Sequence, residues 1–202
     1  MEFDVSVYWN DRYASGGTSG AGSYGRLAEF KSKFLNDFFE RNSVKSVLDF
    51  GCGDGNQIES LYIDQYIGTD ISHEAIAICQ RKFREHEGRT FLHKHDLGSI
   101  RAQATLSLDV IYHLVDDNIY EEYMDLLFSR SEQYVIIYST NEESSSFTEP
   151  HVRHRRFTDW VEQDGNFSLT SVTENQFPPN DTDSSLSNTS PCSFFVFERE
   201  TS

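Results

Sequence analysis

Short apolar runs alternate with longer amphipathic segments along most of this chain. Apolar, partly β-branched runs predict strands at residues 46–50, 66–69, 90–95, 104–109 and 133–139. Apolar residues recur every three or four positions in between, and they predict helices at residues 56–62, 73–85 and 117–130. This strand–helix alternation indicates a mostly parallel sheet with right-handed crossovers.

The two ends of the chain add to this pattern. Residues 26–42 predict a helix with one apolar face, ahead of the first strand. After the fifth strand, residues 156–163 predict a short helix, and residues 167–173 and 192–198 predict two final strands. The segment 178–190 between these strands is rich in Pro, Asn, Asp, Ser and Thr, so we expect a mobile loop there.

The stretch Val47–Gly55 carries the most specific chemical signal. A buried strand ends there in a loop with glycines at 51, 53 and 55, and Cys52 lies inside it. Glycine allows a tight turn and a close approach to a ligand, and a helix expected from Asn56 would point its amino terminus at the same place. A dinucleotide site has the spacing G-x-G-x-x-G instead. Asp49 would repel a pyrophosphate but suits a cofactor with an ammonium group.

Acidic residues also end the next two predicted strands. Asp70 follows Gly51 by nineteen positions, about the separation expected of a carboxylate that binds the two ribose hydroxyls, with Ile71 beside it. A helix-start carboxylate is the alternative for Asp70. Asp96 and Leu97 follow the third strand, where a turn-forming Asp is the alternative.

Candidate chemistry lies just past the fourth strand, in Leu106–Asp117. Asp109 and His113 are four residues apart and share one face if a helical turn begins at Asp109. An Asp beside a His would orient the imidazole and raise its basicity, so we predict His113 as a general base and Asp109 as its partner or as a cofactor ligand. The alternative is that His113 only packs or caps at a helix start.

A basic cluster occupies His151–Trp160 after the fifth strand. Arg153 and Arg155 would bind a carboxylate or phosphate of a substrate. His151 or His154 would bind the same substrate or serve as an alternative general base. A charge-balancing solvated loop is the competing interpretation.

The amino-terminal residues 1–25 combine glycine with aromatic residues. Glycine alone would suit a disordered linker, but Trp and Tyr are unusual in disorder. We therefore predict a lid over the cofactor, with Trp9 and Arg12 facing the cofactor and Tyr13 facing the acceptor, ahead of a single domain at 26–202.

Composition narrows the classes of function. A chain of 202 residues suits one α/β domain, and a net charge of −16 argues against nucleic acid as a partner. The three cysteines are scattered without metal-type spacing, which favours a reducing compartment and no metal. Without an apolar stretch of membrane-spanning length, we expect a cytoplasmic protein that does not insert into a membrane. The oligomeric state is open.

In order, Val47–Gly55, Tyr66–Ser72, Asp96 and Leu106–Asp117 resemble the landmarks of class I S-adenosylmethionine-dependent methyltransferases. The resemblance implies a Rossmann-like α/β domain whose seven-stranded, mostly parallel sheet has the order 3-2-1-4-5-7-6 and helices on both faces. It implies S-adenosylmethionine as cofactor and S-adenosylhomocysteine as product. It places Asp96 beside the adenine amino group, and it places residues after the fourth strand, Ser107 among them, near the methionine moiety. Strand four departs from the family where it reads Gln103-Ala-Thr.

The start Tyr8–Tyr13, the stretch Ser107–Leu114 and the segment His151–Trp160 are also similar to small bacterial methyltransferases of surface-glycan and sugar modification. That similarity implies a hydroxyl of a sugar, a glycan end or a related polar metabolite as acceptor. Other methyl acceptors, metal assistance through Asp116 and Asp117, and a non-catalytic binding protein are the alternatives.

Overall fold

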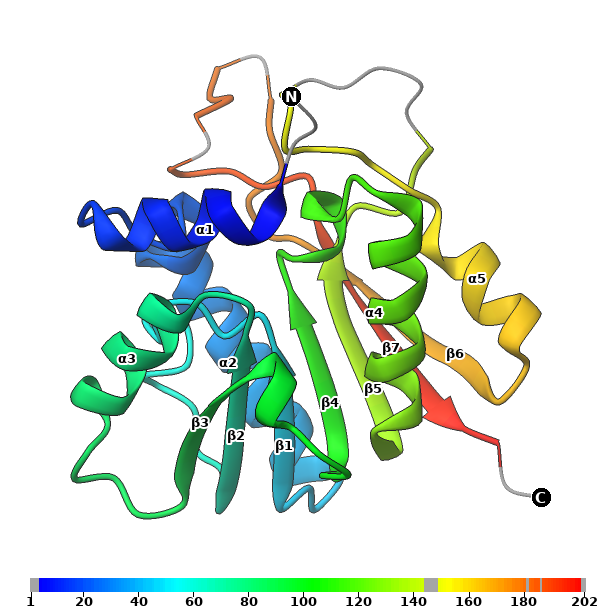
Figure 1. The fold of residues 1–202 in the computed structure, drawn as a ribbon. Helices are drawn as coiled ribbons and strands as arrows, with labels where there is room; N and C mark the ends of the chain where they lie inside the picture. The colour runs from blue at the N-terminus through cyan, green and yellow to red at the C-terminus, as the bar shows by residue number, and fades with distance from the viewer. Residues whose placement is uncertain (1–3, 144–148, 181, 186, 201–202) are drawn as a thin grey trace.

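A seven-stranded sheet forms the centre of the computed structural model, which describes residues 4–143, 149–180, 182–185 and 187–200 (Figure 1). Its strands are β1 (Ser46–Phe50), β2 (Gln65–Asp70), β3 (Arg89–His93), β4 (Ala102–Leu108), β5 (Ser131–Ser139), β6 (Phe167–Glu174) and β7 (Ser193–Arg199). Their order is β3-β2-β1-β4-β5-β7-β6, as expected from the sequence. All neighbouring pairs among β1 to β5 are parallel, and β7 runs antiparallel to β5 and β6.

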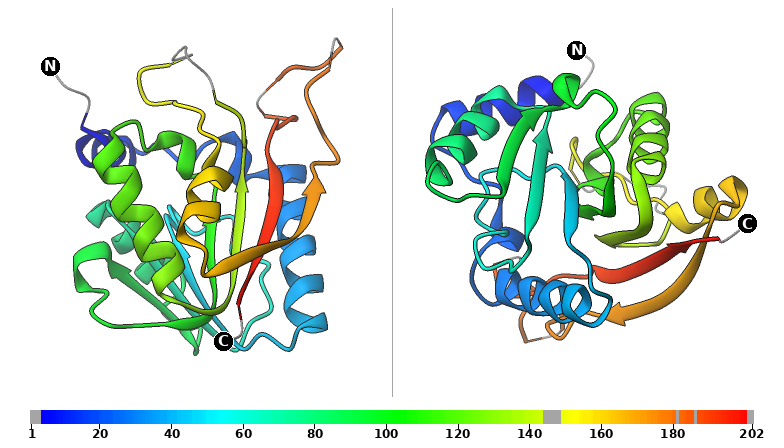
Figure 2. Two further views of the ribbon diagram at one scale, coloured as in Figure 1. Left: turned by 90° about the vertical axis from the view of Figure 1, so that its right-hand side faces the viewer. Right: turned by 90° about the horizontal axis from the view of Figure 1, so that it is seen from below.

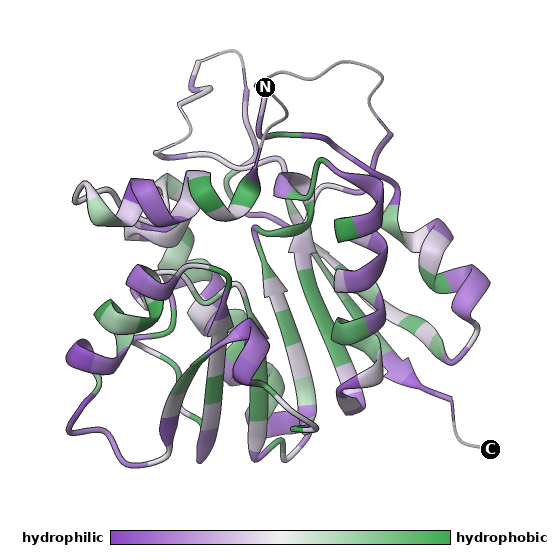
Figure 3. Ribbon diagram, in the orientation of Figure 1, coloured by the Kyte–Doolittle hydropathy of each residue, from purple (hydrophilic) through white to green (hydrophobic). Residues whose placement is uncertain are grey.

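Helices cover both faces of the sheet, as Figure 2 shows. The helices are α1 (Val5–Ala14), α2 (Gly25–Arg41), α3 (His73–Lys82), α4 (Asp117–Ser129) and α5 (Phe157–Asp164), with short turns η1 (Ala21–Ser23), η2 (Lys94–Asp96) and η3 (Ile111–His113). Neighbouring residues of β7 point to opposite faces. Phe194 stacks on Phe34 of α2 with 3.9 Å between ring centroids, whereas Phe195 meets Phe157 of α5 edge-on at 5.0 Å. Apolar residues therefore form one core beneath α2 and α3 and another beneath α4 and α5 (Figure 3).

The helix expected at 56–62 does not form. Its own amides form only isolated turns, from Glu59 to the carbonyl of Asn56 and from Leu61 to that of Ile58. Side chains of other segments bind there as well: Arg89 donates to the carbonyls of Ile58 and Leu61, and Asn36 donates to that of Ser60. The segment is also short, and a helix of so few residues gains little from its own hydrogen bonds. The glycine loop therefore ends in irregular turns rather than at a helix amino terminus.

The amino-terminal segment forms a helix, α1, above the carboxyl ends of the strands (Figure 1). Asp4 caps it by accepting hydrogen bonds from the backbone N–H groups of Ser6 and Val7. Asn10 joins it to α3, because its side-chain oxygen accepts from the Ser72 hydroxyl at 3.2 Å and from the Glu74 amide at 3.4 Å. The helix therefore stands over the edge of the sheet where the predicted site residues gather.

The loop 178–190 lies against the start of α2 in its described part. Arg26 Nε donates to the carbonyl of Asn188 at 2.7 Å, and its guanidinium lies 3.7 Å from the Asp183 carboxylate. Residues 181 and 186 are outside the described part of the chain, so the expected mobility stays a prediction. Within the described ranges, none of the helices has the length and apolar character needed to cross a membrane.

Candidate active site

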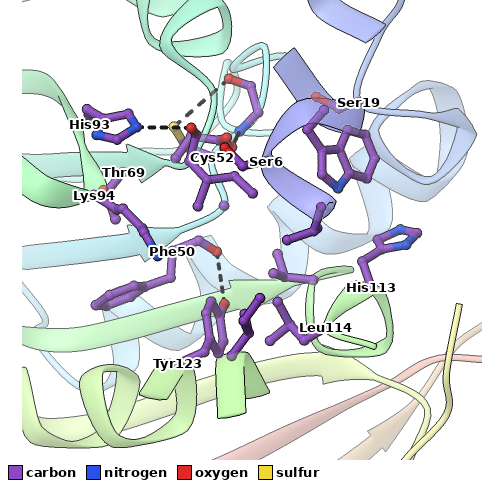
Figure 4. Close-up of a pocket in the computed structure, with 18 of the residues that line it drawn as sticks. Ser6, Ser19, Phe50, Cys52, Thr69, His93, Lys94, His113, Leu114 and Tyr123 are labelled. Atoms are coloured by element: carbon purple, nitrogen blue, oxygen red, sulfur yellow. Dashed lines mark hydrogen bonds between the residues drawn. The ribbon is translucent and has the colours of Figure 1, made fainter. Parts of the chain in front are cut away.

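A cavity of about 230 Å³ opens at the carboxyl ends of β1, β2 and β4, beneath α1 (Figure 4). Predicted site residues that line it are Trp9, Tyr13, Gly51, Cys52, Gly53, Asp70, Ile71, Leu97, Asp109 and His113. Figure 4 places His93 and Lys94 on one side of it and His113 and Leu114 on the other. The cavity thus joins the segments that sequence reasoning treated separately.

The glycine loop fits closely under the amino-terminal segment. Gly53 has a φ of +57°, and a Cβ atom there would lie 2.2 Å from Ser19 Oγ and 2.8 Å from the Tyr13 hydroxyl oxygen. At Gly51, where φ is +83°, a Cβ atom would lie 2.5 Å from a methyl group of Val110. Side chains at these positions would be strained and would collide with the walls of the cavity. Gly55 instead packs against α3, away from the cavity.

Asp70 lies at the floor of the cavity with its carboxylate already oriented. It accepts hydrogen bonds from the backbone N–H groups of Gly53, at 3.0 Å, and of Ser72, at 2.8 Å. Burial raises the pKa of Asp70 to about 6, against the lowering effect of these amides. A carboxylate held in this way is suited to accept hydrogen bonds from the hydroxyls of a ribose.

Asp49 lies below the cavity, in the core of the sheet. The Tyr66 hydroxyl donates to its Oδ2 at 2.6 Å, while Oδ1 is buried without a hydrogen-bond partner. Burial raises the pKa of Asp49 to about 7. It does not line the cavity, so its expected contact with the cofactor stays a prediction.

The end of the cavity away from His113 is bordered by Ile71, His93 and Leu97 (Figure 4). Nε2 of His93 lies 3.0 Å from the carbonyl oxygen of Ile71, and the His93 ring stacks on that of His73 at 3.9 Å. Asp96 is exposed and lies outside the cavity lining, so its adenine contact is still a prediction. The sequence analysis missed His93, although the run His93-Lys-His95 before Asp96 was a usable signal.

Asp109 does not orient His113, which corrects the expectation from their spacing. The two would share a face if a helical turn began at Asp109, but η3 begins at Ile111 and Asp109 has a φ of +61°. In the described structure, the Asp109 carboxylate pairs with Lys31 and accepts a hydrogen bond from the Tyr112 hydroxyl at 3.0 Å. Its charge still acts on His113, but among the described residues no hydrogen bond joins the two side chains.

His113 is oriented by a backbone group instead. Its Nδ1 lies 2.9 Å from the carbonyl oxygen of His151, which accepts but cannot donate. Nδ1 therefore carries the proton, and Nε2 keeps its lone pair. Burial lowers the pKa of His113 to about 4, so the imidazole is neutral near pH 7.

Aromatic rings surround His113 on several sides. Its ring stacks on that of His151 at 5.4 Å, and Trp9 of α1 meets it edge-on at 5.1 Å. Tyr8 of α1 stacks on the other ring of this pair, His151, at 4.9 Å. Rings from α1, η3 and the 149–156 segment thus form one wall beside the cavity.

Arg153 and Arg155 do not face the cavity as expected for acceptor binding. Both donate to the Asp117 carboxylate, at 2.9 and 2.6 Å, and both bind carbonyl groups of residues 114–115. Arg155 also lies over the Tyr120 ring, at 4.6 Å. Their donors hold the start of α4 in place, and their expected contact with an acceptor stays a prediction.

The other predicted contacts lie around the rim or behind the wall. Arg12 donates to the carbonyl of Thr18 at 2.6 Å and lies over Trp9, outside the cavity lining. His154 shares a hydrogen bond with the Thr140 hydroxyl at 2.7 Å. Ser107 is buried in β4 and accepts from the Tyr123 hydroxyl at 2.8 Å. The expected contacts of Arg12, His154 and Ser107 with cofactor or acceptor remain predictions.

Asp54 fastens the amino-terminal segment to the glycine loop, a role that sequence reasoning missed. Its Oδ2 accepts from the Ser19 amide at 2.9 Å and from the Tyr24 hydroxyl at 2.8 Å. The Asp54 amide in turn donates to Ser19 Oγ at 2.9 Å, and Tyr13 shares a hydrogen bond with the same hydroxyl at 3.0 Å. These contacts close the cavity from above. Tyr13 therefore lies against the glycine loop, and its expected contact with the acceptor stays a prediction.

Residues 47–131, from β1 to the start of β5, match the family described as "Methyltransferase domain". Over these residues, the chain is similar to a methyltransferase domain. This match confirms the enzyme class predicted from the sequence, a methyltransferase that depends on S-adenosylmethionine. A search of the curated proteins finds no match.

Solved structures show the same fold at low sequence identity. N-methyltransferase NodS from Bradyrhizobium japonicum WM9, in complex with S-adenosylhomocysteine, is 14% identical, with a TM-score of 0.75 and coverage of 98% of this chain and 100% of that chain. Magnesium protoporphyrin IX methyltransferase from Synechocystis PCC 6803, with bound S-adenosylmethionine, is 16% identical, with a TM-score of 0.70 and 98% of both chains covered. The small RNA methyltransferase HEN1 is 19% identical, with a TM-score of 0.63, over 89% of this chain and 26% of that chain.

Proposed function

We propose that this protein transfers a methyl group from S-adenosylmethionine to a hydroxyl group of a sugar, a glycan end or a related small polar metabolite. The observation that carries the proposal is His113. It borders the cavity past the end of β4, it is neutral, and its Nδ1 is bound to the carbonyl of His151. Nε2 is therefore the nitrogen available to a proton donor in the acceptor.

The residues around the cavity fit the cofactor. Gly51 and Gly53 leave no room for side chains, and Asp70 is held by two amides in an orientation that suits ribose hydroxyls. Ile71 and Leu97 supply apolar contacts for the adenine ring of the cofactor. When bound, S-adenosylmethionine supplies a methyl group on a sulfonium, which is an excellent leaving group.

A base is needed because the acceptor is a weak nucleophile. Methyl transfer is an in-line displacement, so the protein must align acceptor oxygen, methyl and sulfur. An aliphatic hydroxyl must also lose its proton, which goes to Nε2 of His113 in this proposal. The ring wall of Tyr8, Trp9 and His151 would pack against the apolar face of a sugar and exclude water.

The test is methyl transfer from labelled cofactor to a panel of nucleotide sugars and glycan fragments. We expect His113→Ala to lower turnover roughly 10²- to 10⁴-fold. We expect the affinity for S-adenosylhomocysteine, measured by calorimetry, to change less than threefold. The exposed His86, in the turn after α3, supplies the control variant His86→Ala. A large loss of affinity in His113→Ala, or unchanged turnover, would contradict the base role.

The same assay separates the other acceptors. A neutral amine needs little help from a base, so an N-methyltransferase would keep most of its turnover in His113→Ala. Labelled transfer to RNA would overturn the expectation, based on the net charge of −16, that nucleic acid is not a partner. No group of three His, Cys, Asp or Glu suited to a metal occurs in the described residues. Activity lost with a chelator would contradict a metal-free mechanism. The cytoplasmic location is part of this proposal.

A further inference from the structure

A lysine is fully buried beside the cavity, in a chain where most charges are at the surface. Lys31 of α2 has a side chain with 0% exposure, and its ammonium pairs with Oδ2 of Asp109. It also lies 5.0 Å from the centre of the Tyr138 ring. Burying both charges costs free energy in desolvation, so the pair is not explained by stability alone.

Asp109 is held from several directions at the end of β4. Lys31 binds one carboxylate oxygen, and the Tyr112 hydroxyl binds the other at 3.0 Å. A Cβ atom on Gly22 of η1 would lie 3.0 Å from Oδ2, so the amino-terminal segment closes on the same group. The backbone is left-handed, with a φ of +61°, which is uncommon for a residue other than glycine. The carboxylate is therefore fixed at the cavity wall, where its side chain is 15% exposed.

We propose that Lys31 is a positioning residue that keeps Asp109 ionised, and that the Asp109 carboxylate makes the cavity prefer the cationic methyl donor to the neutral thioether product. This inference rests on the proposed function, because it requires the cofactor to occupy the cavity. A fixed negative charge attracts a sulfonium but gains nothing from a thioether. The preference therefore favours exchange of product for fresh donor.

The environment of Asp109 defines what a change at Lys31 would do. The titratable side chains that face this carboxylate are Lys31, Tyr112, His113, Tyr138 and Cys192. Burial lowers the pKa of His113, so Lys31 is the group of this set that can place a positive charge beside the carboxylate. Without Lys31, no cation among these groups would stabilise the charged form of Asp109.

Calorimetric titration with S-adenosylmethionine and with S-adenosylhomocysteine, on the full chain at pH 6 and pH 8.5, tests the proposal. We expect Asp109→Asn to weaken donor binding roughly tenfold and product binding less than twofold. We expect Lys31→Met to bind the donor at least as tightly as the wild type does at pH 8.5, because no ammonium then offsets the carboxylate, and only as tightly as Asp109→Asn does at pH 6. Lys31→Arg, which keeps a cation at this position, should bind the donor as the wild type does at both pH values.

The matched control is Lys33→Met on the same helix. Lys33 also pairs with an aspartate, Asp37 at 2.7 Å, but its side chain is 75% exposed. It should leave both affinities unchanged. In the double variant of Lys31→Met with Asp109→Asn, donor affinity should no longer depend on pH. If Lys31 had only a structural role, adding Asp109→Asn would not remove a pH dependence.

The outcomes distinguish the two proposals. A wild-type protein that binds neither ligand would overturn the proposed function. Equal weakening of donor and product in Asp109→Asn would overturn the preference for the sulfonium, because Asp109 would then act on a part that both ligands share. Donor binding by Lys31→Met that does not depend on pH would overturn the role of Lys31. If Lys31→Met does not fold, Asp109→Asn still decides the preference for the sulfonium, and Lys31→Arg still shows whether a cation at position 31 is sufficient.

Discussion

Replacing Gly53 by Ala tests whether the amino-terminal segment closes the cofactor cavity. The new methyl group would lie 2.2 Å from Ser19 Oγ and 2.8 Å from the Tyr13 hydroxyl, and the residue would keep a φ of +57°. The loop cannot move down, because the Gly53 amide is bound to Asp70 at 3.0 Å. We therefore expect the segment around Ser19 to be displaced.

The magnitude follows from two contributions. A left-handed backbone costs an alanine about 1–2 kcal/mol. Displacing Ser19 breaks its two hydrogen bonds with Asp54 and one with Tyr13, of which the bond to the charged carboxylate contributes about 1.5–3 kcal/mol. The total is about 3–5 kcal/mol in the free energy of unfolding. If the closed segment contributes about 2 kcal/mol to cofactor binding, the Kd rises roughly 30-fold.

Gly98→Ala is the matched control, since Gly98 has a φ of +55° and nothing within 4 Å of a Cβ atom. It shares the backbone strain but not the collision. Urea unfolding, calorimetry with S-adenosylhomocysteine and limited proteolysis within residues 15–24 would be measured for both variants. Equal stability, affinity and cleavage rates in the two variants would refute the closing role of the segment.

Three further changes give distinct outcomes. Burial raises the pKa of Asp49 from 3.8 to about 7. The apo protein therefore loses stability as pH rises through this range, because the buried carboxyl group must ionise. The stability of Asp49→Asn relative to the wild type should increase progressively from pH 4 to pH 8, by at most roughly 4 kcal/mol. A constant difference in Tm across this range would contradict that assignment. Arg155→Ala should lower the free energy of unfolding by about 1–3 kcal/mol, measured by urea unfolding, because the Leu114 carbonyl loses its arginine donor while Arg153 still binds that of Val115. A raised acceptor KM without lost stability would instead restore the anion-binding role. Asp70→Ala should weaken S-adenosylhomocysteine binding at least tenfold, and unchanged affinity would remove the ribose assignment.

Positions of the parallel strands were predictable because most of them are short apolar runs that end near a turn or an acidic residue, whereas the sheet order was expected from the resemblance to class I methyltransferases. Strand β4 shows the limit of this approach. It starts at Ala102, ahead of the expected position, and its register shifts between Ala102 and Ala104. The polar Gln103 that made the sequence atypical accepts a hydrogen bond from the Lys45 amide at 2.6 Å, which satisfies a backbone group outside the ladder.

The site was predictable where one residue acts within its own loop, and not where partners come from distant segments. Gly53 and Asp70 were predicted from local spacing, and both line the cavity. The partner of His113 is a backbone carbonyl 38 residues away, and backbone groups leave no mark in the sequence. Lys31 looked like a polar residue of an amphipathic helix, and only the tertiary structure shows that it is buried.

Helix α1 contacts both halves of the cavity. Tyr13 lies over the glycine loop, while Tyr8 and Trp9 lie against His151 and His113. Any movement of this helix that admits the cofactor would therefore also expose His113 to water. Loading of the donor, entry of the acceptor and departure of both products would then share one conformational step, and the frequency of that step would set an upper limit on turnover.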